Sequence, residues 1–223
     1  MKAAPACAIL VIMATAPAAA GALPAAAPLA APTAPAVAAT AWAAAAPAER
    51  AAAAEVPTVT MKGRPVQLSG TVVTVGDRAP AFTALDNDFQ PVALDSFRGR
   101  PVLISAVPSL DTAVCSMQTR RFDDELAGLP EEVALITISM DLPTAQKRFC
   151  SEEGIERMVV LSDSALREFG HAYGILIPAR GLLARAVFVI DPGGRVVYRE
   201  VVSEISEQPD YQGALDAVRR TVR

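Results

Sequence analysis

Residues 101–115 read PVLISAVPSLDTAVC. The first seven form an almost unbroken apolar run, which is typical of a β-strand that is buried on both faces of a sheet. The next five, 108–112, include Pro, Ser and Asp and predict a turn. Apolar residues then recur at close to helical spacing, so a helix is expected over 111–128. Cys115 is thereby placed in the first turn of a helix that follows a buried strand.

The chain around this stretch alternates between strand and helix patterns. We expect an opening hairpin of strands 59–61 and 66–68, further strands at 92–94, 133–140 and 159–161, a hairpin of strands 186–190 and 195–202, and helices over 143–153, 162–173 and 209–222. This order predicts an α/β sandwich with a central mixed sheet, helices on both faces and an N-terminal β-hairpin. It is compatible with the thioredoxin-like architecture.

The first 55 residues have a different composition, with 29 Ala, 7 Pro and only four charges. Residues 1–20 combine a basic start, a short apolar core and an Ala-x-Ala exit, and they predict a signal peptide. Because Pro17 interrupts the apolar run, it is too short for stable membrane insertion. Residues 21–55 are low-complexity Ala/Pro and predict a disordered linker. A translation start at Met61 is the alternative, so a periplasmic and a cytoplasmic location both remain open.

The remaining residues, 56–223, have the composition of one globular domain with its own core. The net charge of −4 lies entirely on this part, since the four charges of the first 55 residues cancel. An acidic domain without a Lys/Arg-rich run lacks the electrostatic character of a nucleic-acid-binding protein.

Two cysteines, Cys115 and Cys150, lie in the expected domain, and the third, Cys7, lies in the predicted signal peptide. The absence of a CxxC pair argues against a thioredoxin-type dithiol motif. The single histidine, His171, is too little for a convincing Cys/His metal site. On position alone, Cys115 is either a buried, inert cysteine or a reactive one, because the free N–H groups at a helix N-terminus stabilise a thiolate.

The residues around Cys115 match the Pro-x-x-x-Thr-x-x-Cys motif of the peroxiredoxins. From about residue 58 to its end, the chain resembles the thiol peroxidase subfamily, also called the atypical two-cysteine peroxiredoxins. Further matching stretches are KGRPV at 62–66, DLP at 141–143 leading to RFC at 148–150, GLLARAVFVID at 181–191 and EISEQPDY at 204–211.

The resemblance implies a role for five residues. Cys115 resembles the peroxidatic cysteine, whose thiolate attacks the peroxide bond and becomes a sulfenic acid. Thr112 would place its hydroxyl beside the sulfur and the incoming peroxide, and Pro108 would shape the loop and shield the thiolate from water. Arg185 would hydrogen-bond both the sulfur and a peroxide oxygen. Cys150 resembles the resolving cysteine, which would close an intrachain disulfide with Cys115.

The same resemblance implies a peroxidase for hydrogen peroxide and alkyl hydroperoxides that is recycled by thioredoxin or an equivalent dithiol protein. It implies a homodimer and requires no flavin, haem or metal. A peroxide-sensing relay that passes the disulfide to a client protein fits the same residues. A thiol-based metallochaperone fits them less well, because no CxxxC is present. Since a disulfide needs Cα atoms within about 7 Å and the two cysteines are predicted on separate helices, we expect one or both helix ends to unwind during turnover.

Overall fold

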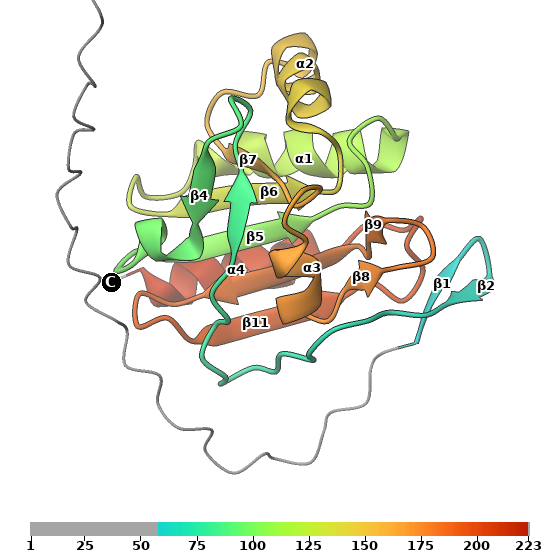
Figure 1. The fold of residues 1–223 in the computed structure, drawn as a ribbon. Helices are drawn as coiled ribbons and strands as arrows, with labels where there is room; N and C mark the ends of the chain where they lie inside the picture. The colour runs from blue at the N-terminus through green and yellow to red at the C-terminus, as the bar shows by residue number, and fades with distance from the viewer. Residues whose placement is uncertain (1–57, 223) are drawn as a thin grey trace, which may run out of the picture. The chain divides into compact units, whose positions relative to one another are not determined.

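The computed structural model describes residues 58–222. Its centre is a seven-stranded sheet (Figure 1). The strands, in the order in which they lie side by side, are β11 (Val196–Val201), β10 (Ala186–Ile190), β5 (Val102–Ala106), β6 (Ala134–Ser139), β7 (Val159–Ser162), β3 (Thr83–Leu85) and β4 (Pro91–Ala93). The pairs β5–β6 and β6–β7 are parallel and the others are antiparallel. The predicted mixed sheet is confirmed.

Helices cover both faces of this sheet, as expected. Helices α1 (Ala113–Leu126), α2 (Pro143–Glu153) and α4 (Tyr211–Thr221) contribute to one apolar core, whereas α3 (Glu168–Ala172) contributes to the core on the opposite face. Figure 1 shows α3 in front of the sheet, with α1 and α4 behind it. Together with the confirmed hairpin described below, this arrangement is the predicted thioredoxin-like α/β sandwich.

The two cores explain the apolar runs in the sequence. All five residues of β5 and all five of β10 are buried. Successive side chains of a strand point to opposite faces. Ile104 and Phe188 accordingly lie in the core beneath α3, while Leu103 and Val187 lie in the core beneath α1 and α4. A strand with helices on both sides has no face left for polar residues, so its sequence shows no alternation.

The helix predicted over 162–173 is wrong in its first half. Ser162 still belongs to β7, and the helix α3 that follows is only five residues long. The side chain of Asp163 accepts hydrogen bonds from the backbone N–H groups of Phe169 and Gly170 (3.1 and 2.8 Å). It therefore caps the first turn of α3, which begins five residues after Asp163. Arg167 has a positive φ of 56°, which breaks the helical path just before α3.

The N-terminal hairpin is present, but its second strand is shifted from the prediction. Strands β1 (Val59–Met61) and β2 (Arg64–Val66) pair in register around a two-residue turn at Lys62 and Gly63. Both turn residues have positive φ, 51° and 72°, which is the conformation that tight hairpin turns require. The expected four-residue turn at 62–65 was too long, and strand 66–68 was therefore placed two residues late.

Several short elements carry no sequence signal of their own. Strand β3, the 3-10 helix η1 (Leu94–Phe97) and the two-residue strands β8 (Leu176–Ile177) and β9 (Leu182–Leu183) were not predicted. Each is too short to show a period of two or of 3.6 residues. Strand β3 also depends on a contact that is distant along the chain, between Leu85 and Ser162, whereas β8 and β9 pair with each other.

The predicted signal peptide (1–20), the predicted linker (21–55) and Cys7 lie outside the described residues and remain predictions. Within residues 58–222, no helix combines the length and the apolar character needed to cross a bilayer.

Candidate active site

Cys115 lies in the first turn of α1, as predicted, and its residue is 1% exposed. The helix begins after Thr112, whose carbonyl accepts the N–H of Ser116 (2.9 Å). The sulfur lies among apolar residues of the core beneath α1 and α4, including Leu110 and Phe122. Because burial without a polar partner disfavours a charged group, a thiolate at this position depends on whatever donor reaches it.

That donor is Arg185, which the strand pairing brings to Cys115 from 70 residues along the chain. Arg185 precedes β10, and the antiparallel register pairs Ala186 with Ala106 at the end of β5. The turn that leads to Cys115 begins at this same end of β5. A long-range strand pair therefore sets the arginine beside the helix that carries the cysteine.

Arg185 is 1% exposed, and its guanidinium uses all three of its nitrogens. Nη2 donates to Cys115 Sγ (3.4 Å), Nε donates to the Ile205 carbonyl (2.8 Å), and Nη1 donates to Gln118 Oε1. Within residues 58–222, none of these hydrogen-bond partners is a carboxylate. A buried cation needs polar partners in place of water, and Cys115 Sγ is one of the three acceptors that the fold brings to this guanidinium.

Gln118 fixes the orientation of this guanidinium and was missed in the sequence. It is fully buried on α1, one helical turn after Cys115. Its Oε1 accepts from Arg185 while its Nε2 donates to Ser105 Oγ (2.8 Å) on β5. A signal was available, because residues three apart on a helix share a face, and a polar side chain on the buried face of Cys115 calls for a partner.

The carbonyl of Ile205, the second anchor of Arg185, is held by the N-terminal hairpin. The Ile205 N–H donates to the Thr60 carbonyl (2.8 Å), and the Thr60 N–H donates to the Ser203 carbonyl (2.7 Å). A chain that started at Met61 would lack Thr60 and both of these hydrogen bonds. The hairpin is thus connected to the guanidinium of Arg185 through Ile205.

Glu204, next to this carbonyl, is fastened to the turn of the hairpin. Its carboxylate accepts the backbone N–H groups of Lys62 (2.9 Å) and Gly63 (3.0 Å) and that of Ser206 (3.1 Å). It also accepts the hydroxyl of Thr60 (2.8 Å). Donation from the Gly63 N–H first, then from the hydroxyl of Ser206 and the N–H groups of Ser206 and Lys62, holds the pKa of Glu204 well below its ordinary value.

We expect Glu204→Gln to lower stability near neutral pH and to matter less in acid. A depressed folded-state pKa contributes stability that is fully present above the ordinary value of 4.5 and is lost as the pH falls toward the folded-state pKa. Urea unfolding of both proteins at about pH 7 and about pH 3 measures this, and the difference between their midpoints should shrink at the lower pH. An equal difference at both pH values would contradict the assignment.

The structure places Thr112 and Pro108 at the active-site loop without a hydrogen bond to the sulfur. Thr112 is exposed at the N-cap of α1, and its hydroxyl donates to the Ser109 carbonyl (3.1 Å). Pro108 is buried in the segment between β5 and α1. The positions suit the loop-shaping role, while the contact of the Thr112 hydroxyl with sulfur and peroxide remains a prediction.

Asp141 anchors this loop and was not predicted as a site residue. Its carboxylate accepts Ser109 Oγ (2.8 Å), the Leu110 N–H (2.7 Å) and Ser139 Oγ (2.8 Å). Asp141 lies between β6 and α2, and α2 carries Cys150. One carboxylate therefore connects the loop before Cys115 with the helix of the second cysteine.

Cys150 lies in the last turn of α2, partly buried, and both it and Cys115 are free thiols. Burial raises the pKa of the Cys150 thiol. The Asn87 Nδ2 group donates to its Sγ (3.7 Å) and opposes this rise, whereas the nearby carboxylate of Asp123 adds to it. The structure thus describes the reduced state, and the pairing of the two cysteines and the unwinding of a helix end remain predictions.

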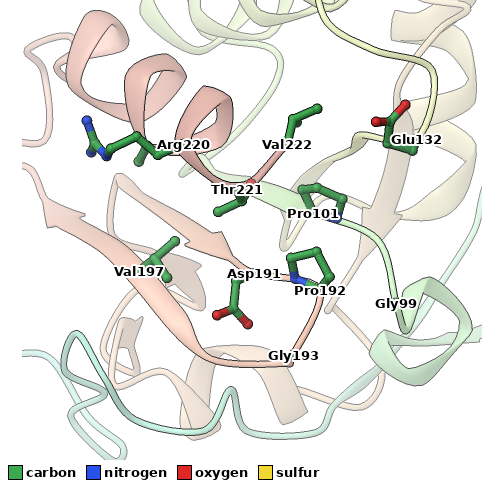
Figure 2. Close-up of a pocket in the computed structure, with 11 residues that line it drawn as sticks. Gly99, Pro101, Glu132, Asp191, Pro192, Gly193, Val197, Arg220, Thr221 and Val222 are labelled. Carbon is green, nitrogen blue, oxygen red and sulfur yellow. The ribbon is translucent and has the colours of Figure 1, made fainter.

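One pocket of the described structure lies away from the predicted site residues. A pocket of about 670 Å³ opens at the start of β5, the strand whose other end leads to Cys115. Figure 2 shows its lining residues from the segment before β5, the β10–β11 turn and the end of α4, and none of the predicted site residues is among them.

Within residues 58–222, no three His, Cys, Asp or Glu side chains are grouped so that they could hold a metal ion.

Comparison with known proteins identifies the family. The Redoxin family profile matches residues 74–215. A thiol peroxidase of Halalkalibacterium halodurans is 50% identical over 162 residues, which cover 73% of this chain and 97% of the relative. The chain belongs to the thiol peroxidase family. A thiol peroxidase of Listeria monocytogenes is 48% identical over 162 residues, covering 73% of this chain and 98% of the relative.

Solved structures agree with this family assignment. A peroxiredoxin-like protein from Aquifex aeolicus superposes with a TM-score of 0.70 at 42% identity, over 74% of this chain and 97% of that one. A thiol peroxidase from Chromobacterium violaceum superposes with a TM-score of 0.68 at 26% identity, over the same shares of the two chains. The thiol peroxidase resemblance and the thioredoxin-like fold are both confirmed.

Proposed function

We propose that this thiol peroxidase family member reduces hydrogen peroxide and alkyl hydroperoxides with Cys115 as the attacking sulfur. The observation that carries the proposal is the buried guanidinium of Arg185, which donates to Cys115 Sγ and has no carboxylate among its hydrogen-bond partners within residues 58–222. The Cys115 thiolate attacks the terminal peroxide oxygen, so an S–O bond forms and the O–O bond breaks. The sulfur is oxidised to a sulfenic acid, and the leaving oxygen takes a proton to become water or an alcohol.

Arg185 supports this step best in the transition state. Negative charge moves from sulfur to the leaving oxygen as the O–O bond breaks, and a fixed cation beside both atoms stabilises that charge without reorganising. The guanidinium is planar and stays charged at every physiological pH. Its anchors at Gln118 and Ile205 hold the fork in place before the peroxide arrives.

In the second step, the Cys150 thiolate attacks the sulfur of the Cys115 sulfenic acid. The S–S bond forms, the S–O bond breaks, and hydroxide leaves as water after taking a proton. The intrachain disulfide is then reduced by thiol–disulfide exchange with thioredoxin or an equivalent dithiol protein.

We extend the proposal to a homodimer. If residues 1–20 act as an export signal, the reductant is a periplasmic dithiol protein, and without export it is a cytoplasmic one.

A coupled assay on the full chain tests this proposal. The protein is mixed with hydrogen peroxide, thioredoxin, thioredoxin reductase and NADPH, and the loss of NADPH and of peroxide is followed. We expect both to fall in equal amounts over many turnovers. A relay that passes its disulfide only to a client protein would consume about one equivalent of peroxide and then stop, and a protein that consumes none would contradict the peroxidase proposal.

A further inference from the structure

The turn between β3 and β4 is cross-linked by its own hydrogen bonds and lies beside α2. The carboxylate of Asp86 accepts the backbone N–H groups of Asp88 and Gln90 (2.8 Å each), and the Asp86 N–H donates to the Gln90 carbonyl (2.9 Å). Gln90 Nε2 donates to the Asp88 carbonyl (3.1 Å). Asp88 also pairs with Lys147 of α2 (2.6 Å), so the turn is held against the helix that carries Cys150.

Asn87 presents its side chain from this turn to Cys150. Its Nδ2 group donates to Cys150 Sγ at 3.7 Å, across 63 residues of sequence. Its Oδ1 atom is buried and has no hydrogen-bond partner within the described residues. An unpaired buried carbonyl oxygen costs free energy, so the turn holds this amide at a cost that no other described contact of Asn87 explains. The contact with sulfur is therefore the feature that needs a function.

The charged groups around Cys150 do not favour its ionised form. From α1, the carboxylate of Asp123 acts on the sulfur and disfavours the thiolate. From the β3–β4 turn, Asp86 is occupied by backbone N–H groups and Asp88 by Lys147.

On α2 itself, Arg148 pairs with Asp111 (3.1 Å) and with Glu152 (3.8 Å), and Glu153 pairs with Arg120 of α1 (3.1 Å). These cations are already matched by carboxylates. Asn87 is thus the side-chain donor that the described structure provides to the sulfur.

We propose that Asn87 is a positioning residue for the resolving step, in which its amide donates to the Cys150 thiolate and holds it ready to attack the Cys115 sulfenic acid. The inference deepens the proposed function and rests on the assignment of Cys150 as the resolving cysteine. Because the donor lies on the β3–β4 turn, it reaches Cys150 while the last turn of α2 is still folded. There it stabilises the thiolate against the cost of burial, before the helix end opens.

The test is the pH dependence of disulfide formation in the full chain. Reduced protein is mixed with one equivalent of hydrogen peroxide, quenched with acid at increasing times, and analysed by mass spectrometry for the sulfenic acid and the disulfide. A hydrogen bond to a charged acceptor changes an ionisation equilibrium about tenfold. We therefore expect Asn87→Ala to raise the midpoint of the pH profile by about one unit and to slow disulfide formation about tenfold below that midpoint. The rate of sulfenic acid formation at Cys115 should not change.

Two further variants separate donation from packing. Asn87→Asp keeps the shape of the side chain but removes the donor and adds a negative charge, so it should raise the midpoint at least as far as alanine does. Gln90→Ala removes a neutral amide from the same turn, where its partner is a backbone carbonyl. It loosens the turn without touching the sulfur, and it should leave the midpoint at the wild-type value.

An unchanged midpoint in both Asn87 variants would overturn the inference, since Cys150 would then ionise only after leaving the turn. A shift of equal size in Gln90→Ala would also overturn it, because loosening of the turn would be sufficient. Failure of the proposed function is distinguished by the wild-type protein in the same experiment. If no Cys115–Cys150 disulfide forms there, the role of Cys150 is wrong, whatever Asn87 does.

Discussion

Cys115→Ser is expected to abolish peroxide consumption entirely, while Cys150→Ser is expected to consume about one equivalent and then stop. The serine hydroxyl is a far weaker nucleophile at neutral pH than a thiolate, so the first variant cannot start the reaction. The second variant still forms the sulfenic acid but has no thiol in place to resolve it. Peroxide loss measured with and without thioredoxin and its reductase separates the two variants.

These variants differ from the wild-type chain by a single atom, so they serve as matched controls for each other. Cys115 is almost fully buried, and Cys150 is partly buried. Circular dichroism should show the same fold for both and for the wild type. Steady turnover by Cys115→Ser would remove Cys115 from the mechanism, and steady turnover by Cys150→Ser with thioredoxin would remove the intrachain disulfide.

Arg185→Met is expected to slow the oxidation of Cys115 by about 10²–10³-fold, the effect seen when a fixed donor to a developing negative charge is removed. Arg185→Lys keeps the positive charge, but its single nitrogen cannot reach the sulfur, Gln118 and Ile205 at once. Its oxidation of Cys115 should therefore be slower than in the wild type, though less so than in Arg185→Met. The measurement is the second-order rate of sulfenic acid formation in the Cys150→Ser background, where no later step contributes.

Removal of a buried arginine also affects the fold, and Arg199 provides the control. It is a half-buried arginine on β11, it forms no described hydrogen bond with either cysteine, and its Nε atom has no partner within residues 58–222. Arg199→Met should leave the oxidation rate within about twofold of wild type. Equal loss of rate in Arg185→Met and Arg199→Met would show that the effect comes from general destabilisation rather than from the contact with Cys115.

The central strands could be predicted because burial on both faces leaves only apolar or small residues, as in β5 and β10. Helix α2 was predicted over its full length because Pro143 marks its first turn and Gly154 adopts the left-handed conformation that closes it, with a φ of 66°. The start of α3 was misplaced because the carboxylate of Asp163 caps backbone groups six and seven residues later. Local propensity does not contain such a contact.

The candidate site shows the same division. The cysteines and Arg185 could be assigned from the motifs that surround them. Gln118, Asp141 and Asn87 were missed, because each acts through a hydrogen bond to a segment that is remote along the chain, and only Gln118 gave a signal, as a polar residue on the buried face of Cys115. Their residue types are ordinary for a helix face, a strand end and a turn. What identifies them is the sulfur, guanidinium or loop that the fold brings to them.

The most direct test of the account is to map the cysteines after a single turnover. Reduced full-length protein with Cys7→Ser, which leaves two cysteines, receives one equivalent of hydrogen peroxide and is digested without reductant for mass spectrometry. The account predicts complete loss of peroxide and one cross-linked peptide that joins Cys115 to Cys150 within a single chain, with no free thiol. Two free thiols beside unconsumed peroxide, or a disulfide that joins two chains, would contradict it.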